Sequence, residues 1–146
     1  MKIDIKQITE GDESVIVRYK EPSPMINGIL KILRSEDKKI WGKTDNGNVC
    51  IGLDDIIYVE SVDDRVFAYT PEEVVRIDGS LNSFMTGNES DTFFRCSKSI
   101  VINVNRIRSL KSLSSNRIDA TMESGEHIII SRRYSSEFRR FLKGGY

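Results

Sequence analysis

Short runs of β-branched and aromatic residues, separated by small polar turns, dominate the carboxy-terminal two-thirds of the chain. Runs of this kind, about 4–8 residues long, are typical of β-strands. In NRIDATME (116–123) apolar and polar residues alternate, which indicates a strand with one solvated face. We therefore expect a mainly β fold with short helices. The other expected strands are IIYVES (56–61), RVFAYT (65–70), EEVVRID (72–78), FFRC (93–96), SIVINVNRIRSL (99–110) and EHIIIS (126–131).

Three segments space their apolar residues as a helix does. Ser23–Pro24 can supply a helix cap and a first helical residue, and the apolar residues that follow predict an amphipathic helix over about 23–36. SLNSFMT (80–86) predicts a short helix. RRYSSEFRRFLK (132–143) predicts a final helix, because its aromatic residues share one helical face.

The amino-terminal segment also carries a strand pattern. KIDIKQI (2–8) and SVIVRY (14–19) alternate apolar and polar positions, and Gly11–Asp12 lies between them. This pattern predicts two neighbouring strands ahead of the first helix.

A hairpin signal separates this segment from the rest. KKIWGKT (38–44) and NVCIGL (48–53) flank an Asn-Gly pair, which is among the strongest short hairpin signals. We expect a small α/β (strand-strand-helix) lobe over residues 1–46 and a β-rich domain over residues 47–146.

Charge is unevenly distributed along the chain. The 22 basic and 22 acidic side chains balance overall. Residues 93–146, however, hold 11 Lys and Arg against 4 Asp and Glu, whereas residues 1–92 hold 11 against 18. This asymmetry indicates a basic carboxy-terminal surface that suits an anion.

Export and membrane signals are absent from the sequence. No apolar run approaches the roughly 20 residues that span a bilayer. The amino terminus, MKIDIKQITEGDE, lacks the apolar core of a secretory signal. Cys50 and Cys96 are the only cysteines, and we expect both to be free thiols. The expected location is the cytoplasm.

Patterns for catalysis and metal binding are weak. His127 is the single histidine and lies on an expected hairpin strand, which favours a solvated residue over a general base. Two cysteines and one histidine do not provide the usual spacing of zinc ligands. The pairs Asp54–Asp55 and Asp63–Asp64 lie at turns, where aspartate is favoured for its local hydrogen bonds. We expect no enzymatic activity, no metal and no cofactor.

Basic side chains lie at the boundaries between the expected elements. Each one could simply solvate the tip of a loop. Together, side chains at several strand-loop junctions could reach the phosphates and groove edges of DNA without a recognition helix. The candidates are Arg65, Lys98 with Ser97 and Ser99 beside it, Arg132 and Arg133.

The order of these motifs resembles the LytTR family of DNA-binding domains over roughly residues 47–143. That family carries an aromatic-Arg segment, a small polar-basic triplet, an apolar-Val-Asn run, a following isoleucine and a late Ser-Arg-Arg. The corresponding residues here are Phe94–Arg95, Ser97–Lys98–Ser99, Val101–Ile102–Asn103, Ile107 and Ser131–Arg132–Arg133.

The resemblance implies a LytTR-like β-rich domain whose loops enter successive major grooves of double-stranded DNA and bend it. It assigns DNA reading to the loop near Arg65, to Lys98 with its flanking serines, and to Arg133. Lys98 could donate to guanine or to a phosphate, and Arg133 could do so bidentately. Many family members carry His-Arg-Ser at the triplet, and lysine lacks the planar fork of arginine, so the contact made by Lys98 can differ.

The amino-terminal lobe departs from many family members, which carry a receiver domain with a phosphorylatable aspartate. The lobe is too short for one, and the chain resembles the stand-alone LytTR regulators. Such regulators are often paired with a small membrane protein that holds them inactive. The well-capped helix over 23–36 motivates the hypothesis that the lobe serves dimerisation or partner binding, with a homodimer as the expected state.

Three functions follow from these patterns. The first and favoured one is a sequence-specific transcriptional regulator of the LytTR type. The second is a LytTR-fold interaction module that has lost DNA binding, and salt dependence separates it from the first. The third is a small enzyme that uses Asp54–Asp55 or Asp63–Asp64, which would require a concave site and a carboxylate with a raised pKa.

Overall fold

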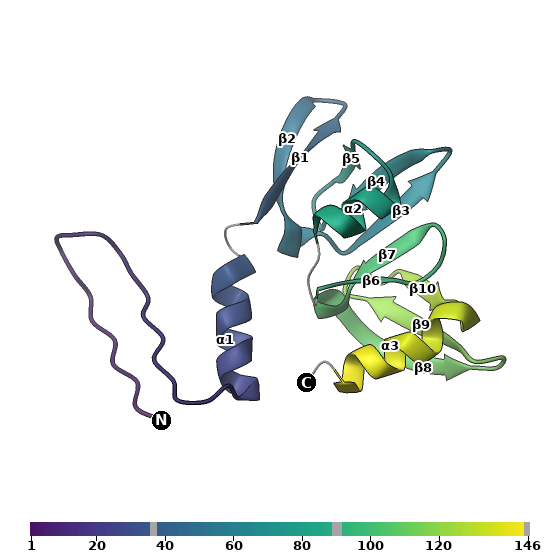
Figure 1. Cartoon of the computed structure of the whole chain (residues 1–146). Coiled ribbons are helices and arrows are strands. Elements are labelled where there is room, and N and C mark those ends of the chain that lie inside the picture. The colour runs from purple at the N-terminus through teal and green to yellow at the C-terminus, as the bar shows by residue number, and fades with distance from the viewer. Residues whose placement is uncertain (36–37, 89–91, 145–146) are drawn as a thin grey trace.

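The computed structural model describes residues 1–35, 38–88 and 92–144 of the 146-residue chain. These residues form two sheets and several helices (Figure 1). The helices are α1 (Pro24–Ser35), α2 (Leu81–Gly87) and α3 (Arg132–Gly144), with 3-10 turns η1 (Leu53–Asp55) and η2 (Val104–Arg106). The strands are β1 (Lys39–Thr44), β2 (Gly47–Gly52), β3 (Tyr58–Val62), β4 (Arg65–Tyr69), β5 (Val74–Ile77), β6 (Phe93–Arg95), β7 (Ile100–Asn103), β8 (Ile107–Leu113), β9 (Arg117–Met122) and β10 (His127–Ile130).

All neighbouring strands pair antiparallel. The larger sheet has seven strands in the order β2-β1-β5-β4-β3-β7-β6, and the smaller has three in the order β10-β9-β8. Tight turns close the hairpins: Asp63 and Asp64 between β3 and β4 have φ of 51° and 61°, as a type I′ turn requires. The expected mainly β fold with short helices is confirmed.

One face of the larger sheet packs against α2. This helix begins with a capping box, in which the Ser83 amide donates to Ser80 Oγ at 3.0 Å and the Ser80 amide donates to Ser83 Oγ at 2.8 Å. The box fixes where the helix starts and which of its residues face the sheet. The fully or largely buried residues between sheet and helix include Val59, Val66, Ala68, Val75, Leu81 and Phe84.

The opposite face of the larger sheet, at β3, β7 and β6, packs against the smaller sheet and α3. The ring of Phe138 in α3 is fully buried and meets the ring of Phe94 edge to face, with 5.0 Å between centroids. The alternation expected over 116–123 is confirmed. Its apolar residues, Ile118, Ala120 and Met122, all lie in this second core.

The segment expected as one strand over 99–110 is divided between the two sheets, so that expectation was wrong. It forms β7 and β8, joined by η2. At the bend, the buried Asn103 side chain donates to the Ile56 carbonyl at 2.8 Å and accepts from the Asn105 amide at 3.0 Å. The asparagine thereby satisfies backbone groups where the ladder stops. Neither glycine nor proline marks the bend in the sequence.

Arg106 ties the two sheets together next to this bend. Its Nε donates to the Asp54 carbonyl at 2.9 Å, its Nη1 pairs with Glu123 at 3.1 Å, and its Nη2 lies 3.7 Å from Asp55. Asp54 and Asp55 belong to η1 beside the larger sheet, whereas Glu123 follows β9 in the smaller one. One guanidinium therefore spans the junction.

β1 approaches β5 very closely at Gly42. A Cβ at this position would lie 2.1 Å from Val75 Cγ1 and 2.8 Å from the Arg76 carbonyl oxygen. Only a residue without a side chain allows the two strands to pair at this distance.

The amino-terminal helix is confirmed as α1. The Ser23 Oγ accepts a hydrogen bond from the Ile26 amide at 3.2 Å, and Pro24 is the first helical residue. The structure describes α1 to Ser35, and residue 36 of the expected helix lies outside the described residues.

The two strands expected over 2–8 and 14–19 do not form, so that part of the expected lobe was wrong. Residues 1–22 run out and back as an extended arm beyond α1 (Figure 1). A lone two-stranded hairpin is marginal in water, and no sheet edge among the described residues pairs with the arm. Residues 2–8 and 14–19 carry the alternating pattern of strands, but no described strand pairs with them.

The expected boundary between an amino-terminal lobe (1–46) and a β-rich domain (47–146) stays a prediction. β1 and β2 pair across it, from Lys39 opposite Gly52 to Thr44 opposite Gly47, so the larger sheet begins at Lys39. Among the described residues, no helix is long and apolar enough to cross a membrane.

Candidate nucleic-acid interface

Three turns that are far apart in the sequence are hydrogen-bonded to one another at one end of the larger sheet. The Ser61 amide, beside the β3–β4 turn, donates to the Ser99 carbonyl at 2.8 Å. The Ser131 amide, where β10 passes into α3, donates to the Cys96 carbonyl at 2.9 Å. The β6–β7 loop therefore lies between the β3–β4 turn and the β10–α3 junction. These three segments hold every site residue expected from the sequence: Arg65, Ser97, Lys98, Ser99, Arg132 and Arg133.

Arg65 is fixed by the β3–β4 turn. It is the first residue of β4 and pairs with Val62 of β3. Asp63 and Asp64 occupy the two turn positions with positive φ, which aspartate tolerates better than most residues. The turn explains this carboxylate pair structurally and leaves the Arg65 side chain exposed at the end of the sheet.

The β6–β7 loop is held in shape by Arg95. Its Nε donates to the Ser97 carbonyl at 3.0 Å, and its Nη2 donates to the Lys98 carbonyl at 2.6 Å. Its Nη1 also bonds the Asn82 side chain of α2. One planar guanidinium thus binds two successive loop carbonyls and anchors them to a helix. The Lys98 and Ser99 side chains are exposed, and Ser97 is half-buried.

Cys96 anchors the same loop from inside. Its amide donates to the Ile100 carbonyl at 2.8 Å, and its side chain is fully buried. Burial raises the pKa of the Cys96 thiol to about 12, so the group stays neutral and packs as a small apolar residue.

α3 begins with two arginines. The Ser131 carbonyl accepts hydrogen bonds from the Tyr134 and Ser135 amides, both at 3.0 Å, so Arg132 and Arg133 occupy the first turn and are exposed. Cationic side chains at a helix amino terminus oppose the helix dipole. An anion bound here would interact favourably with both the arginines and the free amides.

The basic side chains of the three turns have no acidic partner. The four side chains concerned are Arg65, Lys98, Arg132 and Arg133. In the part of the chain that the structure describes, Arg106 is the one lysine or arginine within 4.0 Å of a carboxylate oxygen. Arg65 shares its turn with the exposed carboxylates of Asp63 and Asp64, whereas Lys98, Arg132 and Arg133 have no acidic neighbour within two positions in the sequence. Cations of this second kind contribute positive potential that suits a polyanion.

His127 lies away from these turns, on β10. Its Nδ1 is 3.1 Å from the Asp119 carboxylate and 3.3 Å from Thr121 Oγ1, both across the strand pair with β9. Among residues 1–35, 38–88 and 92–144, no group of three or more His, Cys, Asp or Glu side chains could hold a metal ion.

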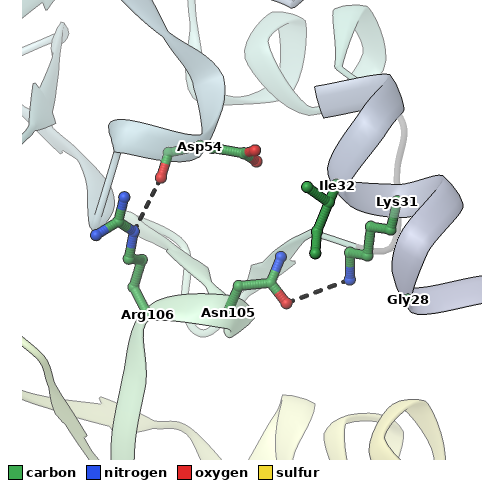
Figure 2. A pocket seen from close by; sticks show the side chains of 6 residues that line it. All are labelled: Gly28, Lys31, Ile32, Asp54, Asn105 and Arg106. Carbon is green, nitrogen blue, oxygen red and sulfur yellow. Dashed lines mark hydrogen bonds between the residues drawn. The ribbon is translucent and has the colours of Figure 1, made fainter. Parts of the chain in front are cut away.

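Figure 2 shows an open pocket of about 400 Å³ between α1 and the bend at η2. Lys31 of α1 donates from Nζ to Asn105 Oδ1 at 3.2 Å, and Arg106 donates to the Asp54 carbonyl (Figure 2). The first of these contacts joins α1 to η2, and the second joins η2 to η1. No site residue expected from the sequence lines this pocket.

Residues 46–143 match the family model of the LytTr DNA-binding domain, which is more than half of the chain. The chain belongs to the LytTR family. A solved LytTr DNA-binding domain from Bacillus cereus is similar to it with a TM-score of 0.70 and 26% sequence identity. The similarity covers 73% of this chain and 98% of that domain.

Two curated relatives are similar over the LytTR region. The sensory transduction protein LytT of Bacillus anthracis is 25% identical over 95 residues, and the transcriptional regulatory protein YpdB of Escherichia coli K12 is 26% identical over 91 residues. These regions are 65% and 62% of this chain but 39% and 37% of the relatives. The chain therefore matches well under half the length of either relative.

Two residues of the LytTR motif have roles that the sequence did not reveal. Arg95 holds the carbonyls of the Lys98 loop, and Asn103 closes the bend between the sheets. Both are polar residues inside otherwise apolar strand segments. That placement is the signal that could have identified them, because a buried polar side chain needs a specific partner.

Proposed function

We propose that this chain is a sequence-specific transcriptional regulator that reads major grooves of double-stranded DNA with the three turns described above. The observation that carries the proposal is the pair of hydrogen bonds that join these turns, Ser61 to Ser99 and Ser131 to Cys96. The proposal is also supported by four basic side chains on these segments, Arg65, Lys98, Arg132 and Arg133, which form no ion pair among the described residues. A regulator of chromosomal DNA would act in the cytoplasm.

Each turn has its own part in this proposal. Arg133 can donate two parallel hydrogen bonds to guanine O6 and N7, whereas Lys98 offers a single ammonium to one of them or to a phosphate. Ser97 and Ser99 hydroxyls and the first amides of α3 suit phosphate oxygens, which fix register without reading sequence. Arg65 can enter the groove next to the one that Lys98 enters.

The test begins with a duplex that the full chain itself enriches from a random-sequence DNA pool. Its affinity is then measured by fluorescence anisotropy at several salt concentrations, beside a scrambled duplex. We expect strong preference for the enriched duplex and an affinity that falls steeply with salt, because bound Lys and Arg release counterions. If no sequence is enriched, the hypothesis of a LytTR-fold interaction module replaces the hypothesis of a DNA-binding regulator.

We also propose that the arm of residues 1–22, together with α1, forms the interface of a homodimer. The arm exposes apolar side chains at levels unusual for a folded surface: Ile3 at 76%, Ile5 at 89%, Val15 at 71% and Ile16 at 74%. Contiguous exposed apolar groups mark contact surfaces. Its lysines and aspartates are interspersed, so a second copy offers matching charges.

Sedimentation equilibrium of the full chain tests the dimer. We expect a dimer at micromolar concentration, and we expect the double change Ile3→Glu and Ile5→Glu to give a folded monomer. Leu110→Glu on β8, where the side chain is 43% exposed, is the matched control and should remain dimeric. A wild-type monomer at all concentrations would remove this proposal and direct attention to the small membrane protein that the family resemblance implies.

A further inference from the structure

The larger sheet has an open face, of which the contacts proposed above use only Arg65 at one end. Side chains alternate between the two faces along β1 and β5: Trp41 and Lys43 of β1 are exposed on either side of buried Gly42, and Arg76 of β5 is exposed beside buried Val75. The buried members of this alternation face α2. The exposed members therefore lie together on the opposite face.

The strand register places these exposed side chains in continuous rows. Phe67 of β4 pairs with Arg76 of β5, and Arg76 pairs with Lys43 of β1. Trp41 lies two residues from Lys43 on the same face, and Arg65 lies two residues from Phe67. The open face thus runs without interruption from Arg65, at the proposed DNA-reading edge, toward β1.

The smaller sheet covers only the other end of this face. Tyr58 of β3, Ile102 of β7 and Phe94 of β6 belong to the core shared with the smaller sheet, and no residue of β1, β2 or β5 does. Accordingly, Trp41 is 71% exposed and Val74 of β5 is 48% exposed. The part of the face formed by β1, β5 and the start of β4 is uncovered by any described residue.

We infer that this open face binds the phosphodiester backbone of the duplex that flanks the sequence read by the three turns. The inference rests on the proposed function. Lys43 and Arg76 form no ion pair within the described residues, and Lys39 projects from the same side of β1. Lysine and arginine side chains commonly contact phosphate oxygens, which position the duplex without reading its sequence.

Distance supports a single continuous duplex. Neighbouring strands are about 4.8 Å apart, so Lys43 on β1 lies about 10 Å across the sheet from β4, which begins at Arg65. That separation is smaller than the width of one duplex. Trp41 adds an indole N–H beside Lys43 that can donate to a phosphate oxygen.

The charges of the face favour DNA over a protein partner. Lys39, Lys43 and Arg76 lie at the β1–β5 end of the face with one carboxylate, Asp78, just beyond β5. The carboxylates of Glu60 and Glu126 act on Tyr58 and Tyr69, toward β3. The exposed large apolar side chains on this side of the strands are Trp41, Val74 and Val62, each on a different strand. Apolar side chains scattered singly are normal on a protein surface. Positive charge that continues directly from the DNA-reading edge matches the polyanion already bound there.

The experiment compares the enriched duplex with the same duplex extended by about one helical turn, roughly 10 base pairs, on each side. Full-length wild type should bind the extended duplex roughly tenfold more tightly at low salt, with a steeper salt dependence. The double change Lys43→Ala and Arg76→Ala should abolish that gain and reduce the salt slope by about 1.8, which corresponds to two phosphates. It should leave the affinity for the short duplex unchanged.

A control variant and a fluorescence measurement test whether the gain in affinity comes from this face. The control change Arg108→Ala and Lys111→Ala removes two exposed cations from β8 and should keep the whole gain. Trp41 is the only tryptophan in the sequence, so its fluorescence reports on this face alone. We expect its emission to change with the extended duplex and to stay constant with the short one.

Three results would overturn the inference. Equal binding of the short and extended duplexes, or a gain that survives the Lys43→Ala and Arg76→Ala change, removes the flanking contact while sequence-specific binding stands. Loss of dimerisation in the double variant would assign the face to a second copy of the chain. Failure of wild type to enrich any sequence would overturn the proposed function and this inference together.

Discussion

The Ser131 amide donates a hydrogen bond of 2.9 Å to the Cys96 carbonyl. The bond joins the junction between β10 and α3 to the β6–β7 loop of the larger sheet. This bond sets the distance between the loop that carries Lys98 and the helix start that carries Arg133. Two residues 35 positions apart in the sequence can then present cations to one ligand. Cys96 directly follows β6, and Ser131 lies between β10 and α3, so regular elements hold both backbone groups from their neighbours in the chain.

Arg95→Lys should weaken specific DNA binding without unfolding the protein. Lysine keeps the positive charge but cannot bond the Ser97 and Lys98 carbonyls together, so the loop loses its fixed shape. We expect roughly a tenfold loss of affinity for the enriched duplex, about 1.4 kcal/mol, in an anisotropy titration. Arg117→Lys, at an exposed site whose Nε bonds only the nearby Ser114 carbonyl, is the matched control. Equal affinities for both variants would show that Arg95 does not position Lys98.

Asn103→Ala should cost about 2–3 kcal/mol in the free energy of unfolding. The change leaves the buried Ile56 carbonyl and the Asn105 amide without the bonds they make to this side chain. Urea denaturation followed by circular dichroism measures the loss. Asn105→Ala removes only an exposed contact to Lys31 and should stay within about 0.5 kcal/mol of wild type. A loss below 1 kcal/mol for Asn103→Ala would contradict the role of Asn103 at the bend.

Gly42→Ala should destabilise the protein by about 3 kcal/mol, at the upper end of the usual cost of overpacking. The added methyl group would stand 2.1 Å from Val75 Cγ1 and 2.8 Å from the backbone of Arg76, so β1 must move away from β5. Gly28→Ala in α1 meets nothing within 4 Å and should leave stability unchanged or raise it by up to about 1 kcal/mol. Thermal and urea unfolding of both variants make the comparison. A Gly42→Ala protein as stable as wild type would mean that the two strands separate easily.

The two cysteines should differ sharply toward a thiol reagent. Cys50 is exposed and should react at once at pH 8, whereas Cys96 should react only when denaturant unfolds the chain. Because burial raises the pKa of Cys96 from 9.0 to about 12, the thiol ionises in the unfolded chain before it does so in the folded one. Its contribution to stability is therefore complete below pH 9 and is lost as the pH rises toward 12. Two fast thiols in the native protein would contradict the buried position of Cys96.

The sequence predicted most of the fold because local patterns and tertiary packing agree there. In 116–123 the alternation matches a strand with one face in the core, and at Ser23–Pro24 the cap and the helix coincide. The arm over 2–8 and 14–19 carries the same alternation, yet it forms no ladder. A strand exists only when another strand bonds its backbone, and that requirement cannot be read from one segment.

The sequence predicted which residues belong to the candidate site, but it did not predict that they lie close together. Arg65, Lys98 and Arg133 each stand at an element boundary that composition marks. Their proximity depends on β3 pairing with β7 and on the Ser131 bond to Cys96, which are contacts of long sequence separation. The division of 99–110 was missed for a related reason, since the bend is made by Asn103 and not by a turn residue.

The most direct test of the account measures the ratio of affinities for the enriched and scrambled duplexes in wild type, Lys98→Ala and Arg133→Ala, with Lys111→Ala as control. The account predicts that each of the first two changes costs about 1–3 kcal/mol in binding the enriched duplex and much less in binding the scrambled one. The control should keep the wild-type ratio. If Lys98→Ala and Arg133→Ala both keep that ratio, the three turns do not read DNA sequence, and the central claim is wrong.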